Sequence, residues 1–185
     1  RNADAAIAAF RRATELDPRY ARAWNNLGSA LRDTGRLAEA EAAYARAADA
    51  DPRYVFAWVN LGAALRDLGR NDDAAAAFAR ALALDAKQAH ALTGLAGLRR
   101  GEGRIDEAAS LYERALAADP RDAGTWLHYG GTLAERDDLP SALRAYVEAE
   151  ARDPRLLRAL CGRYLTLPMV PGSAEELASA RAGYV

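Results

Sequence analysis

The sequence repeats with a period of 34 residues, and this period restricts the fold more than any other feature. One position of the period is always alanine, the position four residues later is always aromatic, and the position three residues after that is again alanine. The aromatic position is filled by Phe10, Tyr44, Phe78, Tyr112 and Tyr146. The alanine positions are filled by Ala6, Ala40, Ala74, Ala108 and Ala142, and by Ala13, Ala47, Ala81, Ala115 and Ala149. Such self-similarity predicts a row of stacked units, each packed mainly against its neighbours.

Each unit shows the hydrophobic spacing of two helices. Trp24, Leu27 and Leu31 follow the i, i+3, i+7 spacing of one helical face, and a second face begins at Ala40 and Tyr44. Alanine is the most frequent residue type of the chain, and it favours helix because it loses no side-chain entropy there. The pattern therefore predicts an all-α chain of antiparallel helix pairs.

Small residues are predicted where the two helices of a unit cross. Gly28 of the first helix and Ala40 of the second have little or no side chain, so the helix axes can approach closely. The ring of Tyr44 is expected to fill the remaining space. The glycine column continues through Gly28, Gly62, Ala96 and Gly130.

The ends of the predicted helices are also periodic. Glycine closes the first helix of three units, where a left-handed residue costs glycine little. These glycines are Gly35, Gly69 and Gly103. Asp137 takes this place in the fourth unit, and Pro140 suits the first turn of the helix that follows. Asp-Pro pairs close most units, at Asp17-Pro18, Asp51-Pro52, Asp119-Pro120 and Asp153-Pro154, whereas the second full unit has Asp85-Ala86.

These residues resemble the tetratricopeptide repeat (TPR) pattern, because the first full unit contains Ala23-Trp-Asn-Asn-Leu-Gly28 followed by Ala40, Tyr44, Ala47 and Pro52. The resemblance covers roughly residues 1–156. It implies an all-α, right-handed superhelix, or TPR solenoid, whose first helices line a concave groove that binds other proteins. The expected organisation is the second helix of a truncated repeat at 1–20, full repeats at 21–54, 55–88, 89–122 and 123–156, and a capping helix with a linker at 157–185.

Asn26 and Asn60 stand one repeat apart on the predicted groove side, and a carboxamide can both donate to and accept from a peptide group. They resemble the asparagine ladder of the O-linked N-acetylglucosamine transferase groove, but Gly94 and His128 interrupt the column. Arg32-Asp33 and Arg66-Asp67 recur at the same spacing and are expected to add charged contacts. The alternative is that these residues are solvated surface copied by repeat duplication. The other groove candidates are Arg22, Asn25, Ser29, Phe56, His90 and Thr93, with Gly97, Arg100, His128 and Glu135 further along.

Other readings of the groove are weaker. A carboxylate clamp like that of chaperone-binding repeats is disfavoured, because Asn25 stands where a clamp lysine is expected. Trp24, Trp58 and Trp126 occupy a packing column and are interpreted as core residues. Phe56 is either a hydrophobic anchor for a ligand or a packing residue.

The remaining composition argues against several classes of function. The net charge of −1 gives no reason to expect nucleic acid or an anionic membrane as a partner. Cys161 is the single cysteine, and His90 and His128 lie in different units, so no metal site, cofactor or catalytic constellation is expected. No apolar run approaches the ~18 residues of a membrane-spanning helix. We expect a cytoplasmic chain that is not an enzyme by itself.

Two further expectations concern the ends. Residues 165–177 resemble the junction in bacterial SPINDLY-like proteins, which would make the chain a substrate-recruiting region of a larger O-GlcNAc-transferase-like glycosyltransferase whose catalytic domain is absent. A generic linker is the alternative. The helix of residues 1–20 lacks its partner, so its apolar face around Ile7 and Phe10 is expected to support self-association.

Overall fold

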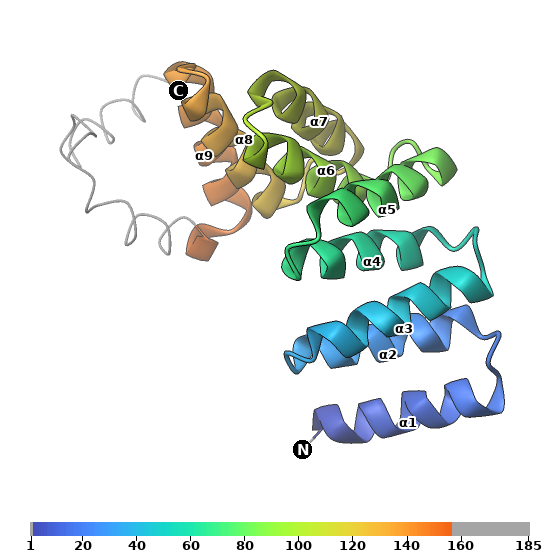
Figure 1. Cartoon of the computed structure of the whole chain (residues 1–185). Coiled ribbons are helices and arrows are strands. Elements are labelled where there is room, and N and C mark those ends of the chain that lie inside the picture. Colours follow the sequence, from blue (N-terminus) through green and yellow to red (C-terminus); the bar gives the residue numbers. More distant parts are fainter. Residues whose placement is uncertain (1, 157–185) are drawn as a thin grey trace.

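The computed structural model describes residues 2–156, and within them every regular element is a helix. The helices pack in sequence order into a curved row (Figure 1). Their bounds are α1 Asn2–Leu16, α2 Ala21–Asp33, α3 Leu37–Ala50, α4 Val55–Asp67, α5 Asn71–Leu84, α6 Ala89–Gly101, α7 Ile105–Ala118, α8 Ala123–Glu135 and α9 Leu139–Arg152. The expected capping helix and linker at 157–185 lie outside the described residues.

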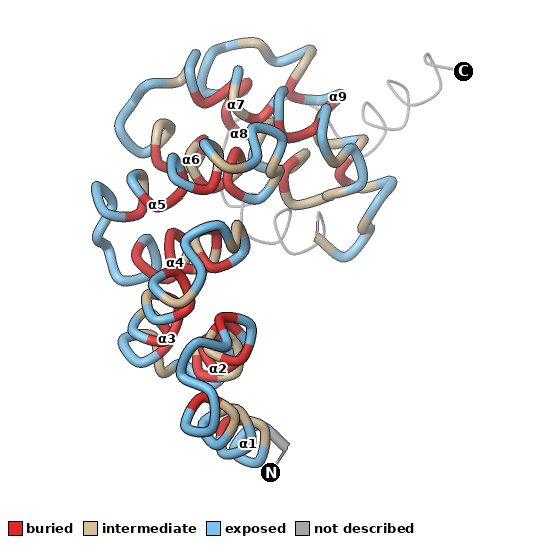
Figure 2. The backbone as a smooth tube through the Cα atoms, turned by 90° about the vertical axis from the view of Figure 1, so that its right-hand side faces the viewer, coloured by how far each residue is buried: buried red, intermediate tan, exposed pale blue. Residues whose placement is uncertain are grey.

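Four helix hairpins follow α1, namely α2–α3, α4–α5, α6–α7 and α8–α9, and we number them first to fourth. Their buried residues face the interfaces between helices, while the outward faces are exposed (Figure 2). The turns inside the hairpins have the predicted left-handed residues: Gly35, Gly69 and Gly103 have φ of 77°, 77° and 75°. Asp137 adopts a φ of 61° at the corresponding place in the fourth hairpin, and Pro140 lies in the first turn of α9, as predicted.

The close helix crossing predicted at Gly28 is confirmed. A Cβ atom on Gly28 would lie 2.7 Å from the ring of Tyr44, which is only 1% exposed. Ala40 is fully buried beside them. A glycine in α2 therefore lets the aromatic side chain of α3 lie directly against the helix backbone.

Enlarging Ala40 is expected to destabilise the chain by about 1–3 kcal/mol, because a closely packed crossing cannot take a leucine without moving its neighbours. Urea denaturation of Ala40→Leu measures the loss. Ala42→Leu, on an exposed position of the same helix, is the matched control and should change stability little. Equal losses in the two variants would contradict the packing argument.

The tryptophan column also belongs to the packing, as interpreted from the sequence. Trp24 and Trp58 lie against the hydrophobic core, and their indole Nε1 atoms donate to the carbonyl oxygens of Pro18 and Pro52, each at 3.0 Å. Trp126 does the same with the carbonyl of Pro120. Each tryptophan thus links its own helix to the preceding turn by a hydrogen bond.

The expectation of a free apolar face on the N-terminal helix is wrong for Ile7 and not for Phe10. Ile7 is only 4% exposed and belongs to the main core cluster, and Phe10 packs against that cluster. The physical reason is that α1 packs on α2. Phe10 stays partly exposed, whereas its equivalent Tyr44 is 1% exposed, so self-association through this face stays a prediction.

Candidate functional site

One side of the array is lined by the first helices of the hairpins. Each of α2, α4, α6 and α8 contacts the next one in this series, whereas the second helices α3, α5, α7 and α9 do not contact one another within the described residues. Helices that touch lie on the shorter, inner side of a curved row. We call the surface formed by α2, α4, α6 and α8 the inner wall.

The two asparagines of the predicted ladder differ in environment. Asn26 is exposed. Asn60 is half-buried, and its Nδ2 donates to Oδ1 of Asn25 at 2.8 Å. Asn25 was expected to face a ligand, and this is corrected: its side chain is 7% exposed and holds the neighbouring hairpin through Asn60. The second N–H and the carboxamide oxygen of Asn60 can still bond to a ligand.

The interruption of the ladder has a packing cause. The position that follows Asn60 by one repeat is Gly94, which is buried against the ring of Phe78. The next position is His128, whose ring stacks on Tyr112 with centroids 6.4 Å apart and planes 21° from parallel. Phe78 of the second hairpin and Tyr112 of the third thus reach this column of the hairpin that follows. At Gly94 the ring of Phe78 leaves no room for a side chain.

A ladder of ion pairs crosses the inner wall between hairpins. Nε and Nη2 of Arg32 donate to Oδ2 of Asp67 at 3.1 and 2.8 Å. Nε of Arg100 donates to the two carboxylate oxygens of Glu135 at 3.0 and 3.1 Å. Both pairs join residues 35 positions apart, one repeat plus one residue, and this spacing is the signal that the sequence reasoning missed. Arginine and acid side chains expected to contact a ligand are therefore largely occupied with each other.

Arg66 is the exception in this ladder. The residue 35 positions after it is Gly101, which has no carboxylate. Nη2 of Arg66 donates instead to Oδ1 of Asp67, its neighbour in sequence, at 3.1 Å. That carboxylate is already engaged by Arg32.

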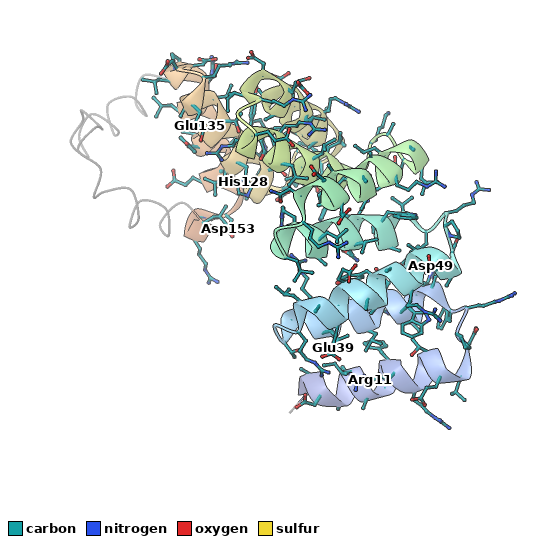
Figure 3. The ribbon with its side chains drawn as sticks, viewed as in Figure 1. Arg11, Glu39, Asp49, His128, Glu135 and Asp153 are labelled. Carbon is teal, nitrogen blue, oxygen red and sulfur yellow. The ribbon has the colours of Figure 1, made fainter. Side chains whose placement is uncertain are left out.

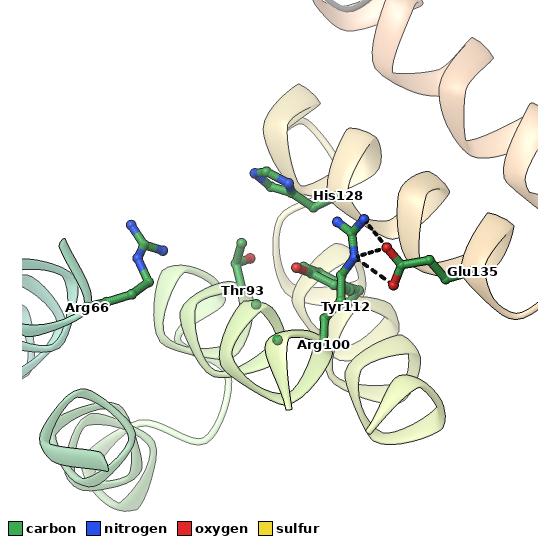
Figure 4. Close-up of a pocket in the computed structure, with 8 residues that line it drawn as sticks. Arg66, Thr93, Arg100, Tyr112, His128 and Glu135 are labelled. Carbon is green, nitrogen blue, oxygen red and sulfur yellow. Dashed lines mark hydrogen bonds and ion pairs between the residues drawn. The ribbon is translucent and has the colours of Figure 1, made fainter. Parts of the chain in front are cut away.

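A pocket of about 410 Å³ opens on the inner wall beside Arg66 (Figure 4). It brings together six of the predicted groove candidates, namely Arg66, Thr93, Gly97, Arg100, His128 and Glu135. Arg100 and Glu135 form one side of it, and Figure 4 shows Arg66 on the side opposite to them. The lining is completed by Gly101 and Tyr112.

Tyr112 is the pocket residue that sequence reasoning assigned to packing alone. It is 2% exposed, and burial raises the pKa of its hydroxyl. In the first hairpin the equivalent Tyr44 hydroxyl lies 3.2 Å from Oγ of Ser29, but Gly97 stands in the place of that serine here. Among the described residues no hydrogen bond to the Tyr112 hydroxyl is present, so it adds a polar group to the pocket.

The pKa of His128 lies below its ordinary value of 6.5. Loss of hydration lowers it most, the positive charges of Arg100 and Arg66 lower it further, and Asp122 opposes the shift. The imidazole is therefore neutral at pH 7. Arg66 and Arg100 supply the positive charge of the pocket.

The pH dependence of stability follows from this shift. A histidine whose pKa is lower in the folded chain binds protons more readily when unfolded, so its contribution to stability is present above pH 6.5 and is lost as the pH falls below that value. When the pH is lowered from about 7.5 to about 5, the free energy of unfolding should fall less in His128→Gln than in the unaltered chain. Urea denaturation at several pH values measures this. If the stability of the two proteins falls equally with pH, the assignment of this pH dependence to His128 is contradicted.

The other predicted site residues lie outside the pocket. Arg22, Asp33 and His90 are exposed on their helices, and Ser29 is partly buried. Phe56 is 56% exposed and makes a tilted ring contact with Tyr54 at 5.9 Å. The ends of the array are visible in Figure 3, where Arg11 and Glu39 lie side by side at one end and His128 and Glu135 lie near the other.

Three models of the tetratricopeptide repeat match the chain, over residues 1–55, 54–121 and 99–164, and together they cover residues 1–164. The chain is a tetratricopeptide repeat protein. The fold predicted from the 34-residue period is therefore confirmed. All three matched models describe this repeat, so the glycosyltransferase alternative gains no support, and residues 165–177 lie outside the described part.

Several solved structures have a similar fold. A crystal structure of MamA has a TM-score of 0.70 at 22% identity, covering 84% of this chain and 91% of that one. MamA from Desulfovibrio magneticus RS-1 gives 0.69 at 16% identity, with 83% and 86% covered. YrrB, described as a TPR protein with an unusual peptide-binding site, gives 0.65 at 25% identity, with 88% and 84% covered. No curated protein matches the sequence. None of the helices between residues 2 and 156 has the length and apolar character needed to cross a bilayer.

Proposed function

We propose that this TPR protein is an interaction scaffold that binds an extended peptide segment of another protein along its inner wall, without catalysing a reaction. The observation that carries the proposal is the repetition of hydrogen-bonding groups on this wall, with Asn26 exposed and Asn60 half-buried one repeat further on. Groups repeated along a row suit a ligand whose own backbone groups repeat. YrrB, a protein of the same fold, is described as having a peptide-binding site.

The affinity of such a ligand is spread over several hairpins. One neutral hydrogen bond contributes about 0.5–1.5 kcal/mol net, so no single asparagine can hold a peptide. Several contacts together support binding in the micromolar range. Phe56, with more than half of its side chain exposed, supplies an apolar contact near the start of α4.

A display selection tests the proposal without assuming the ligand. A library of random dodecapeptides is panned on the protein, and the Kd of the best peptide is measured by fluorescence anisotropy. We expect an Asn26→Ala, Asn60→Ala double variant to bind this peptide several-fold more weakly.

The control is an asparagine-to-alanine change on a second helix, away from the inner wall. Asn71→Ala alters an exposed asparagine of α5 and should leave the affinity unchanged. Thermal unfolding of each variant shows whether the array is intact. Failure to select any peptide, or equal affinity of a folded double variant, would contradict binding through the asparagines of the inner wall.

A further inference from the structure

The third hairpin combines two glycines on the inner wall in a way that no other hairpin does. One position is filled along the array by Ser29, Ala63, Gly97 and Gly131, and the other by Asp33, Asp67, Gly101 and Glu135. Only the third hairpin has glycine at both. Gly97 and Gly101 line the pocket, and the absent side chains leave the space that the pocket occupies.

The charges around this pocket do not cancel. Arg32 and Arg66 both bond to the carboxylate of Asp67, so two positive charges share one negative charge there. Arg100 and Glu135 balance each other. By the 35-residue spacing of the ladder, the acidic partner of Arg66 would be residue 101. This residue is glycine and has no carboxylate. Among the residues that line the pocket, Arg66 and Arg100 are positive and Glu135 is negative, so the lining carries one excess positive charge.

Hydrogen-bonding groups accompany this charge. The Tyr112 hydroxyl reaches the pocket without a partner among the described residues, and Thr93 also lines it. Thr125 donates its hydroxyl proton to Oδ2 of Asp122, so Thr93 donates to Oγ1 of Thr125, 2.8 Å away, and offers the pocket only an acceptor. The Tyr112 hydroxyl is therefore the hydroxyl donor of the pocket. A guanidinium and a hydroxyl around a cavity form a site for an oxyanion, since hydrogen bonds between charged partners are the stronger ones.

We propose that this pocket binds the carboxylate of an aspartate or glutamate side chain carried by the peptide on the inner wall. The inference rests on the proposed function and specifies the ligand as an acidic segment. A carboxylate supplies one negative charge and so replaces the acid that Gly101 lacks. A phosphate group carries about −1.5 to −2 and would place surplus negative charge beside Glu135 and Asp67.

The test introduces a carboxylate at position 101, where the ladder of ion pairs lacks one. Fluorescein-labelled hexaglutamate and hexaglutamine serve as the probes, and anisotropy gives their affinities. Gly101→Asp places a carboxylate next to Arg66, and Gly101→Ala is its matched control. A Cβ atom at Gly101 meets no atom within 4 Å, so both variants should fold.

We expect hexaglutamate to bind more tightly than hexaglutamine, and Gly101→Asp to weaken hexaglutamate binding about tenfold. Gly101→Ala adds only an uncharged methyl group to the lining and should weaken binding much less. Arg66→Gln should weaken binding about as much as Gly101→Asp does. Arg114→Gln removes the same charge from an exposed position of α7 and should have little effect. In NMR titrations, bound hexaglutamate should raise the pKa of His128.

Three results would overturn the inference. These are equal binding of the two probes, equal effects of Gly101→Asp and Gly101→Ala, or inorganic phosphate displacing hexaglutamate at concentrations where acetate does not. The proposed function is judged separately by the display selection. If selected peptides need Asn26 and Asn60 but are indifferent to Arg66→Gln, the inner wall binds peptide and the carboxylate site is wrong.

Discussion

Phe78→Ala is expected to lower the free energy of unfolding by about 3–5 kcal/mol, the cost typical of emptying a buried aromatic site. Phe78 of α5 is 1% exposed. Its ring lies against Gly62 of α4 and against Gly94 of α6, so one side chain joins the second hairpin to the third. The truncated residue leaves a cavity at the junction, and a glycine on either side has no side chain with which to fill it.

Phe78→Ala should also weaken the coupling between the hairpins on either side of this contact. In a repeat protein, stability is approximately a sum of unit terms and neighbour terms, and Phe78 contributes to the neighbour term in the middle of the row. We therefore expect urea unfolding of Phe78→Ala to broaden or to separate into two steps. Phe56→Ala, which removes an exposed ring from the adjacent helix, is the control and should shift stability by less than about 0.5 kcal/mol. A loss below about 1 kcal/mol in Phe78→Ala would contradict the packing described above.

Gly94→Asn is expected to destabilise the chain by about 2–6 kcal/mol, although it would restore an asparagine at the next position of the ladder. Its Cβ atom would overlap the ring of Phe78, and its carboxamide would be buried without assured partners. Overpacking costs about 1–3 kcal/mol, and an unsatisfied buried polar group costs a similar amount.

The control for this change lies on the same helix. Gly101→Asn introduces the same side chain at a site with open space around it, and it should be nearly neutral. Urea denaturation of the two variants gives the comparison. A stable Gly94→Asn protein that binds selected peptides more tightly would show that the ladder, and not the packing of Phe78, determines this position.

The features that the sequence predicts correctly are those fixed within one hairpin. Gly35 and its equivalents mark turns because a left-handed residue is a local requirement, and Gly28 with Tyr44 marks a crossing because both helices of the pair recur at constant spacing. The family resemblance then supplied the stacking of the hairpins. Asp137 shows that the turn conformation is kept even where glycine is absent.

The features that the sequence reasoning missed depend on how one hairpin is rotated against the next. The pairing of Arg32 with Asp67 joins first helices of different hairpins, and so does the burial of Asn25 under Asn60. A column of equivalent positions does not reveal these contacts, because each joins non-equivalent positions of adjacent hairpins. The pocket likewise needs the third and fourth hairpins in place before Tyr112 and His128 meet.

The most direct test of the inner wall as the binding surface is site-specific photo-crosslinking to the peptide obtained by display selection. The photoreactive residue p-benzoylphenylalanine replaces Asn26 or His128, which are exposed on first helices, and in matched proteins Ala76 or Ser110, which are exposed on second helices. Our account predicts crosslinks from the first pair only. Crosslinking from Ala76 or Ser110 at equal or greater yield would place the peptide on the second helices and contradict it.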